Sequence, residues 1–232
     1  MLALKDTNDL PTTNLMEKIC NRANLNQAYK RVKANKGCAG IDKMTVDELL
    51  AYLKSKGEEI KSQLLSGTYK PQPVMGIDLP KSGGGTRKLG VPVVVDRWIQ
   101  QAIHQVLSPI FEAEFSDSSF GFRPGRGAHD ALKHSQQQVQ EGKVWCVDID
   151  LESYFDTVNH DRLMSKLAKK IEDERLLKLI RKFLQAGIMQ NGIFEARNTG
   201  TPQGGLCKAL HNPPYAKKVI MQSSIQNPQY FQ

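Results

Sequence analysis

Two aspartates separated by one apolar residue, Asp148 and Asp150, are the side chains in this sequence best suited to chemistry. They stand in a run from Val144 to Leu151 in which apolar and polar residues alternate, and this pattern predicts a β-strand. Successive side chains of a strand point to opposite faces, so both carboxylates should line one surface while Val147 and Ile149 enter a core. Mg²⁺ prefers carboxylate and phosphate oxygens. Metal-dependent phosphoryl chemistry is one hypothesis, and a solvent-facing strand without chemistry is the alternative.

Large aromatic residues follow the aspartates directly. Tyr154 and Phe155 are placed where their rings can turn in beside the acids and pack against a sugar. Membership of the core is the alternative for Phe155. His160 and Asp161 are expected to begin a helix, and we assign them no chemistry.

Two pairs of basic residues are placed at turns. Lys81 and Arg87 bracket a run of glycines, so both can face a triphosphate from a hairpin. Arg123 and Arg126 flank a rigid Pro-Gly turn, an arrangement suited to phosphate contact. Solvated side chains at a hairpin tip are the alternative for the first pair, and structural pairing with a buried acid is the alternative for Arg123.

A loop of different character stands near residue 200. It reads Thr201-Pro202-Gln203-Gly204-Gly205, which combines an amide with glycines that let the backbone approach a ligand closely. Taken by itself, this stretch indicates only a loop.

Helical patterns dominate the chain before residue 70 and again after residue 94. Thr45 to Glu48 fits a capping box that starts a helix carrying Leu49, Leu50 and Leu53. Further helices are expected from Val94 onward and from His129 to Gln140, followed by two more after His160. The residues expected to form their buried stripes are Val95, Trp98, Ile99, Ala102, Ile103, Val106, Leu107 and Ile110, then Leu163, Leu167 and Ile171, then Leu177, Ile180 and Leu184.

Strands are expected around the glycine-rich turn. The runs from Val74 to Leu79 and from Arg87 to Val95 predict a β-hairpin. Together with the strand from Val144 to Leu151 and the helices, this gives an α+β fold. Residues 206–232 show no clear periodicity and are expected to be poorly ordered.

The composition favours an acidic partner and a reducing environment. Lys and Arg total 32 against 24 acidic residues, a net charge of +8, which favours a polyanion such as nucleic acid. A merely soluble basic protein is the alternative. The four cysteines form no C-x-x-C pair, so a zinc site is not expected. We expect the cysteines to be free thiols in the reducing cytoplasm. With no signal peptide and no long apolar run, no membrane partner is expected.

These motifs together resemble one family. Residues 145–156 resemble motif A of polymerase palms, and residues 150–161 resemble the group II intron reverse transcriptases in particular. Similar blocks stand in order between residues 20 and 205: Asn24 to Asp42, Gly67 to Pro71, Pro80 to Pro92, Phe120 to Arg126 and Gly200 to Gly205. The resemblance implies a partial right-hand polymerase fold with a helical amino-terminal region (1–70), fingers hairpin and incomplete palm sheet (71–205), and a divergent tail (206–232).

The resemblance also implies roles for the candidate residues. Asp150 would be the catalytic metal ligand, joined by the carbonyl of Leu151, with Mg²⁺ as the cofactor. Phe155 matches the bulky residue that lies under the sugar 2′ position and rejects ribonucleotides. The residues expected to contact the incoming nucleotide are Lys81, Arg87, Phe155, Gln203 and Gly204, and those expected to contact nucleic acid are Arg123 and Arg126.

The chain departs from the family after Gly205. The family continues there with Pro-Leu-Ser-Pro-Leu-Leu and then a Tyr-Ala-Asp-Asp hairpin, whereas this chain reads Leu206-Cys207-Lys208 and has no such hairpin. The expectation is a truncated RNA-directed DNA polymerase, inactive alone, whose partners are RNA (intron or template), primer DNA and a deoxynucleoside triphosphate. An inert RNA-binding remnant, a pseudogene product and a fragment completed by another chain are the alternatives.

Overall fold

The computed structural model describes residues 12–80, 84–143, 145–148 and 154–201, so the predicted tail at 206–232 lies outside the described residues. The described residues form two compact units. Unit 1 comprises residues 12–80, 84–113 and 154–201, and unit 2 comprises residues 114–143 and 145–148. The helix and strand content confirms the predicted α+β class.

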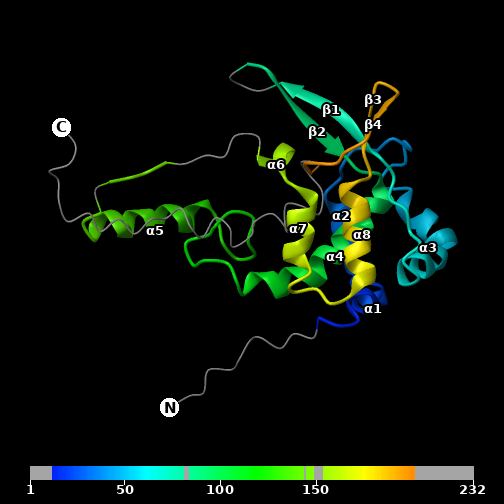
Figure 1. The fold of residues 1–232 in the computed structure, drawn as a ribbon, viewed down its shortest axis with the longest axis horizontal. Coiled ribbons are helices and arrows are strands. Elements are labelled where there is room, and N and C mark those ends of the chain that lie inside the picture. The colour runs from blue at the N-terminus through cyan, green and yellow to red at the C-terminus, as the bar shows by residue number, and fades with distance from the viewer. Residues whose placement is uncertain (1–11, 81–83, 144, 149–153, 202–232) are drawn as a thin grey trace, which may run out of the picture. The chain divides into compact units, whose positions relative to one another are not determined.

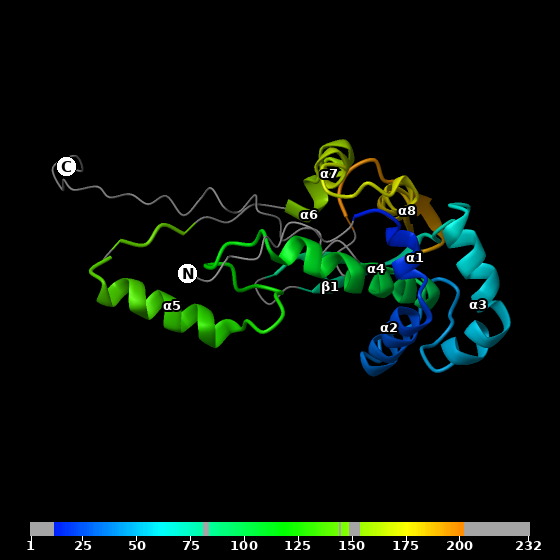
Figure 2. The same cartoon turned by 90° about the horizontal axis from the view of Figure 1, so that it is seen from below.

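Helices build the core of unit 1. They are α1 (Leu15–Ile19), α2 (Arg22–Ala34), α3 (Leu49–Leu65), α4 (Val94–Glu112), α6 (Tyr154–Thr157), α7 (His160–Leu167) and α8 (Glu174–Leu184). The predicted stripe of α4 is confirmed, with Ile99, Ala102 and Ile103 completely buried. The two views agree that α4 runs between α2 on one side and α8 on the other (Figures 1 and 2). A helix in this position must be apolar over a wide arc, which is why its periodicity is so clear in the sequence.

Polar contacts tie the amino-terminal helices into this core. The indole N–H of Trp98 in α4 donates to the carbonyl of Leu25 in α2 at 3.0 Å. The Asp173 carboxylate before α8 accepts from the backbone N–H of Met16 at 3.0 Å. The Arg175 guanidinium donates hydrogen bonds to both carboxylate oxygens of Glu17, at 2.7 and 2.8 Å. The helices before residue 70 therefore belong to the same core as α4 and α8.

The start of α3 follows the predicted capping pattern in part. Glu48 Oε2 accepts hydrogen bonds from the backbone N–H and the hydroxyl of Thr45, each at 2.8 Å. The helix itself begins at Leu49, which is buried, while Leu50 lies largely exposed.

The sheet of unit 1 is made of two hairpins. Strands β1 (Val74–Pro80) and β2 (Thr86–Val91) pair antiparallel, which confirms the predicted hairpin. The second strand ends at Val91 and not at Val95, because Pro92 has no N–H to continue the ladder and α4 begins at Val94. Strands β3 (Ile188–Gln190) and β4 (Ile193–Glu195) form the second hairpin. Parallel pairing of β3 with β1 joins them in the order β2-β1-β3-β4 (Figure 1).

One predicted element is wrong over its described part. Residues 145–148, the centre of the strand predicted from Val144 to Leu151, are not in a strand. Val147 was expected to be buried and is 77% exposed, and Trp145 is 90% exposed. A palm strand needs neighbouring strands to satisfy its backbone, and no strand in the described residues pairs with this segment. Ile149 and Asp150 lie outside the described residues.

Unit 2 consists of a loop followed by one long helix. Helix α5 (Ala128–Gln140) matches the predicted helix from His129 to Gln140. The Asp130 carboxylate accepts from the N–H of Gly127 at 2.8 Å and so caps the helix start.

Candidate functional site

Residues 155–159, at the end of the predicted motif A and just after it, are hydrogen-bonded to residues 199–201. Thr201 donates its backbone N–H to the carbonyl of Phe155 at 2.7 Å, and Gly200 donates to Val158 at 2.8 Å. Asn159 and Thr199 form an antiparallel bridge beside these bonds. Two stretches that are about forty residues apart in the sequence therefore lie against each other.

A buried histidine completes this junction. His160 is 3% exposed, and its Nε2 lies 2.6 Å from the carbonyl oxygen of Gly200. A carbonyl oxygen only accepts hydrogen bonds, so Nε2 carries the proton in this contact. Asn159 caps α7 by accepting from the N–H of Arg162 at 2.9 Å, which fixes His160 in the first turn. The helix begins at His160 as the sequence predicts, but nothing in the sequence around His160 indicates this contact.

Gly200 is required by the geometry of the junction. Its φ is +77°, a left-handed conformation that favours glycine. A Cβ at this position would lie 2.8 Å from the carbonyl oxygen of Asp156. The close approach of the two backbones therefore depends on the missing side chain.

A pocket opens beside the junction. Four parts of unit 1 contribute to it: the β1–β2 hairpin, α6, β3 and the segment after β4. The described residues that line it are Gly76, Lys88, Leu89, Gly90, Asp156, Ile188, Gln190, Arg197 and Thr201. The fingers hairpin and the segments that flank the predicted nucleotide-binding residues thus meet at one place.

Two buried polar atoms in the pocket lining lack hydrogen-bond partners among the described residues. They are the hydroxyl oxygen of Thr201, a residue that is completely buried, and Nη1 of Arg197, which is half-buried. Buried polar groups are normally paired, so such atoms in a pocket need an explanation.

Most of the predicted nucleotide-binding and metal-binding residues lie outside the part of the chain that the structure describes. They are Asp150, Leu151, Lys81, Gln203 and Gly204. Phe155 is half-buried in α6, and its carbonyl takes part in the junction. Arg87 stands in β2 opposite Leu79 of β1.

The predicted nucleic-acid contacts, Arg123 and Arg126, order the loop of unit 2. Arg123 donates from Nη1 to the carbonyls of Ser116 and Ser119, at 2.7 and 2.9 Å, and its guanidinium lies 5.0 Å from the Phe115 ring centre. Arg126 pairs with Asp117 and lies over Phe120. These two hydrogen bonds from Arg123 end on backbone carbonyls, so they serve loop structure, and phosphate contact by either arginine stays a prediction.

Helix α2 carries a basic surface. Its residues include Arg22, Lys30, Arg31 and Lys33, all exposed, and no acid. Arg31 also helps to lower the pKa of His104, although burial of that ring is the larger cause.

The described part of the chain contains no helix long and apolar enough to cross a membrane. Its cysteines, Cys20, Cys38 and Cys146, carry free thiols as predicted. Among the same residues, no three His, Cys, Asp or Glu side chains converge as a metal site would require.

Comparison with known proteins decides the family. A family model described as reverse transcriptase (RNA-dependent DNA polymerase) matches residues 79–227. The chain belongs to the reverse transcriptase family. Polymerases of this family use a divalent metal and bind RNA and DNA.

Relatives confirm the predicted resemblance to group II intron proteins. The chain is 37% identical over 186 residues to the group II intron-encoded protein LtrA of Lactococcus lactis subsp. cremoris, covering 79% of this chain and 30% of LtrA. It is 36% identical over 192 residues to protein YkfC of Escherichia coli (strain K12), covering 80% of this chain and 50% of YkfC. The chain therefore spans half of the length of these relatives or less.

A solved structure supports the fold. The partial Cas6-RT-Cas1--Cas2 complex matches with a TM-score of 0.58 and 24% identity, covering 88% of this chain and 34% of that one. This likeness confirms the reverse transcriptase fold that the resemblance implies.

Proposed function

We propose that this chain forms the fingers and the first half of the palm of an RNA-directed DNA polymerase of the group II intron type. In this role it binds intron or template RNA, primer DNA and a deoxynucleoside triphosphate. One observation carries the proposal: Asp156 of α6, Thr201 and the β1–β2 hairpin line a single pocket, and the backbone of Thr201 is bonded to Phe155. Polymerase chemistry needs these parts together because it depends on positioning of the nucleotide.

The chain's own residues would bind and orient the substrate. Lys81 and Arg87 would hold the triphosphate, Phe155 would lie under the sugar, and Gln203 with Gly204 would lie against the base pair being formed. The junction through Gly200 and His160 would keep residues 199–201, which precede Gln203 in the sequence, beside Phe155.

A divalent metal would supply charge neutralisation of the phosphates when it is bound. Mg²⁺ on Asp150 and the Leu151 carbonyl is the assignment that the resemblance favours. The described residues do not form a cation site by themselves, and Asp150 and Leu151 lie outside them.

A second candidate function is RNA binding without catalysis, and the basic surface of α2 favours it. Phosphate contacts depend on distributed cations, whereas polymerisation depends on a few placed carboxylates. RNA affinity would therefore survive in a chain that does not extend a primer.

The test is a fluorescence anisotropy titration of the purified chain with a labelled single-stranded RNA of about 20 nucleotides over a series of salt concentrations. Affinity should fall steeply with salt, with a log–log slope of about −0.7 for each phosphate contact. Arg31→Glu in α2 should weaken binding and flatten the slope. Lys178→Glu in α8, also an exposed cation on a helix, is the matched control and should have a smaller effect. No binding at low salt, or binding that ignores salt, would refute the proposal.

A further inference from the structure

The segment that carries Arg197 is held at both ends. Strand β4 ends two residues before it, at Glu195, and the bridge between Asn159 and Thr199 lies two residues after it. The backbone of Arg197 is therefore fixed before any ligand arrives, which reduces the entropy lost on binding. Thr201 is fixed in the same way, because its N–H is bonded to Phe155.

The polar side chains of the pocket lining comprise the donors Lys88 and Arg197, the acceptor Asp156, and Gln190 and Thr201, which can do both. Nη1 of Arg197 and the hydroxyl of Thr201 are buried without a hydrogen-bond partner in the part of the chain that the structure describes. A ligand rich in acceptor oxygens would satisfy both atoms, and a phosphate is such a ligand.

The net charge of the pocket lining indicates which kind of phosphate the pocket would bind. Its described lining contains two cations, Lys88 and Arg197, and one acid, Asp156, which is a net charge of +1. A phosphodiester carries one negative charge and matches this balance, whereas a triphosphate carries several and would be repelled by Asp156. The apolar wall made by Leu89 and Ile188 also suits the sugar or base edge that accompanies a phosphodiester.

We propose that Arg197 and Thr201 bind one backbone phosphodiester of the RNA strand at this pocket. The proposal rests on the proposed function, since it assigns the pocket to the RNA and leaves the triphosphate to the hairpin residues. Arg197 is then a positioning residue: it fixes the strand beside the junction of Phe155 and Thr201.

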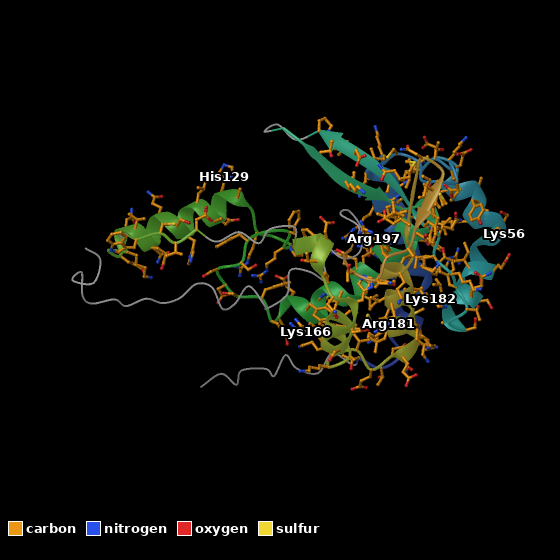
Figure 3. All side chains as sticks on the ribbon, turned by 45° about the horizontal axis from the view of Figure 1, so that its top comes forward. Lys56, His129, Lys166, Arg181, Lys182 and Arg197 are labelled. Carbon is orange, nitrogen blue, oxygen red and sulfur yellow. The ribbon has the colours of Figure 1, made fainter. Side chains whose placement is uncertain are left out.

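The experiment compares Arg197→Ala, Arg197→Lys and Thr201→Val in the full chain, with Lys56→Ala as control. Lys56 is an exposed cation of α3 that lies apart from Arg197 (Figure 3). The probe is the same labelled RNA in a salt series, and a second arm measures binding of dTTP with Mg²⁺ by equilibrium dialysis.

Arg197→Ala should weaken RNA binding about tenfold and reduce the salt slope by about 0.7, the value of one contact to a single strand. Arg197→Lys should keep the slope and regain part of the affinity, because the charge remains while the guanidinium fork is lost. Thr201→Val, which keeps the shape, should cost about threefold, as loss of one hydrogen bond predicts. Binding of dTTP should not change in any variant, and Lys56→Ala should bind RNA normally.

Three results would overturn the inference. If Arg197→Ala binds RNA as tightly as the unmodified chain does, Arg197 does not contact the RNA. Loss of dTTP binding with RNA binding intact would make this a triphosphate site. Equal losses in the Ala and Lys variants, with an unchanged slope, would show a structural role only. If the unmodified chain binds no RNA, the proposed function itself fails. If the unmodified chain binds RNA but the variants give one of the three results above, only this inference fails.

Discussion

The hydrogen bond from His160 to Gly200 is the contact whose loss should disturb the site most. In His160→Ala, the buried carbonyl of Gly200 loses its donor, which costs about 1–3 kcal/mol. Removal of a ring that is 3% exposed leaves a void and adds a further cost, so the total should be about 2–4 kcal/mol. The damage should be greatest at residues 199–201.

His160→Gln and His160→Asn make a matched pair for this test. The side-chain amide nitrogen of glutamine stands near the position of the histidine Nε2. The introduced glutamine can therefore donate to the same carbonyl, and this variant should cost about 1 kcal/mol or less. The amide of asparagine is one carbon shorter and stands near the position of Nδ1, so that variant should behave like His160→Ala.

The assay is urea unfolding followed by circular dichroism, together with hydrogen exchange of the amides of Gly200 and Thr201. Both amides donate across the junction, so both should exchange faster in the Ala and Asn variants. If the Gln and Ala variants have equal free energies of unfolding and equal exchange rates, the hydrogen bond does not hold the junction and the reasoning is wrong.

Gly200, Asp96 and Asp150 give three separate tests. Gly200→Ala should lower the free energy of unfolding by about 1–3 kcal/mol, measured in urea, because Ala is strained at positive φ and its Cβ meets the Asp156 backbone; an unchanged midpoint would count against the close approach. Burial raises the pKa of Asp96 from 3.8 to about 6, although a 2.7 Å hydrogen bond from Tyr69 opposes the shift. A raised pKa gives stability that is fully present below the unfolded value and is lost as pH rises through about 6. Melting curves between about pH 4 and pH 7 should therefore show this loss, and Asp96→Asn should flatten it; an equal slope in the variant would refute the assignment. The purified 232 residues should give background primer extension on poly(rA) and oligo(dT) with Mg²⁺ or Mn²⁺, because the resemblance supplies Asp150 as the only catalytic acid; extension abolished by Asp150→Ala would contradict this.

Elements with local signals could be predicted from the sequence. The stripe of α4 repeats at helical spacing, and the β1–β2 hairpin is marked by prolines and glycines, so both were found within a few residues of their bounds. The resemblance then gave the family. These signals are local because a helix or a hairpin turn is decided by neighbours in the chain.

The β3–β4 hairpin was missed although a signal exists. Asn191-Gly192 stands between Gln190 and Ile193, and both residues of the dipeptide have positive φ, 52° and 79°, as a two-residue hairpin turn requires. The strands are only three residues long, so their alternation is weak. The parallel pairing of β3 with β1 joins distant parts of the chain and leaves no mark in either segment.

The junction at Gly200 could not be predicted for the same reason. The roles of Gly200 and His160 come from a contact over forty residues, and neither residue looks unusual among its neighbours. At the strand predicted from Val144 to Leu151 a local signal is present, but its described part does not form the structure that the signal indicates. Alternation at residues 145–148 indicated a half-buried strand, but alternation does not supply a partner strand, and the described part of this segment has none.

The central claim is that the β1–β2 hairpin, α6 and the segment after β4 form one polymerase site that places the nucleotide beside the RNA strand. The most direct measurement is photo-crosslinking of 4-thiothymidine triphosphate to the full chain, followed by mass spectrometry of the modified peptides. Adducts should concentrate in residues 74–91, 154–160 and 203–205 and should be displaced by unlabelled dTTP. Adducts confined to α3 or α8, or adducts that dTTP does not displace, would contradict the account.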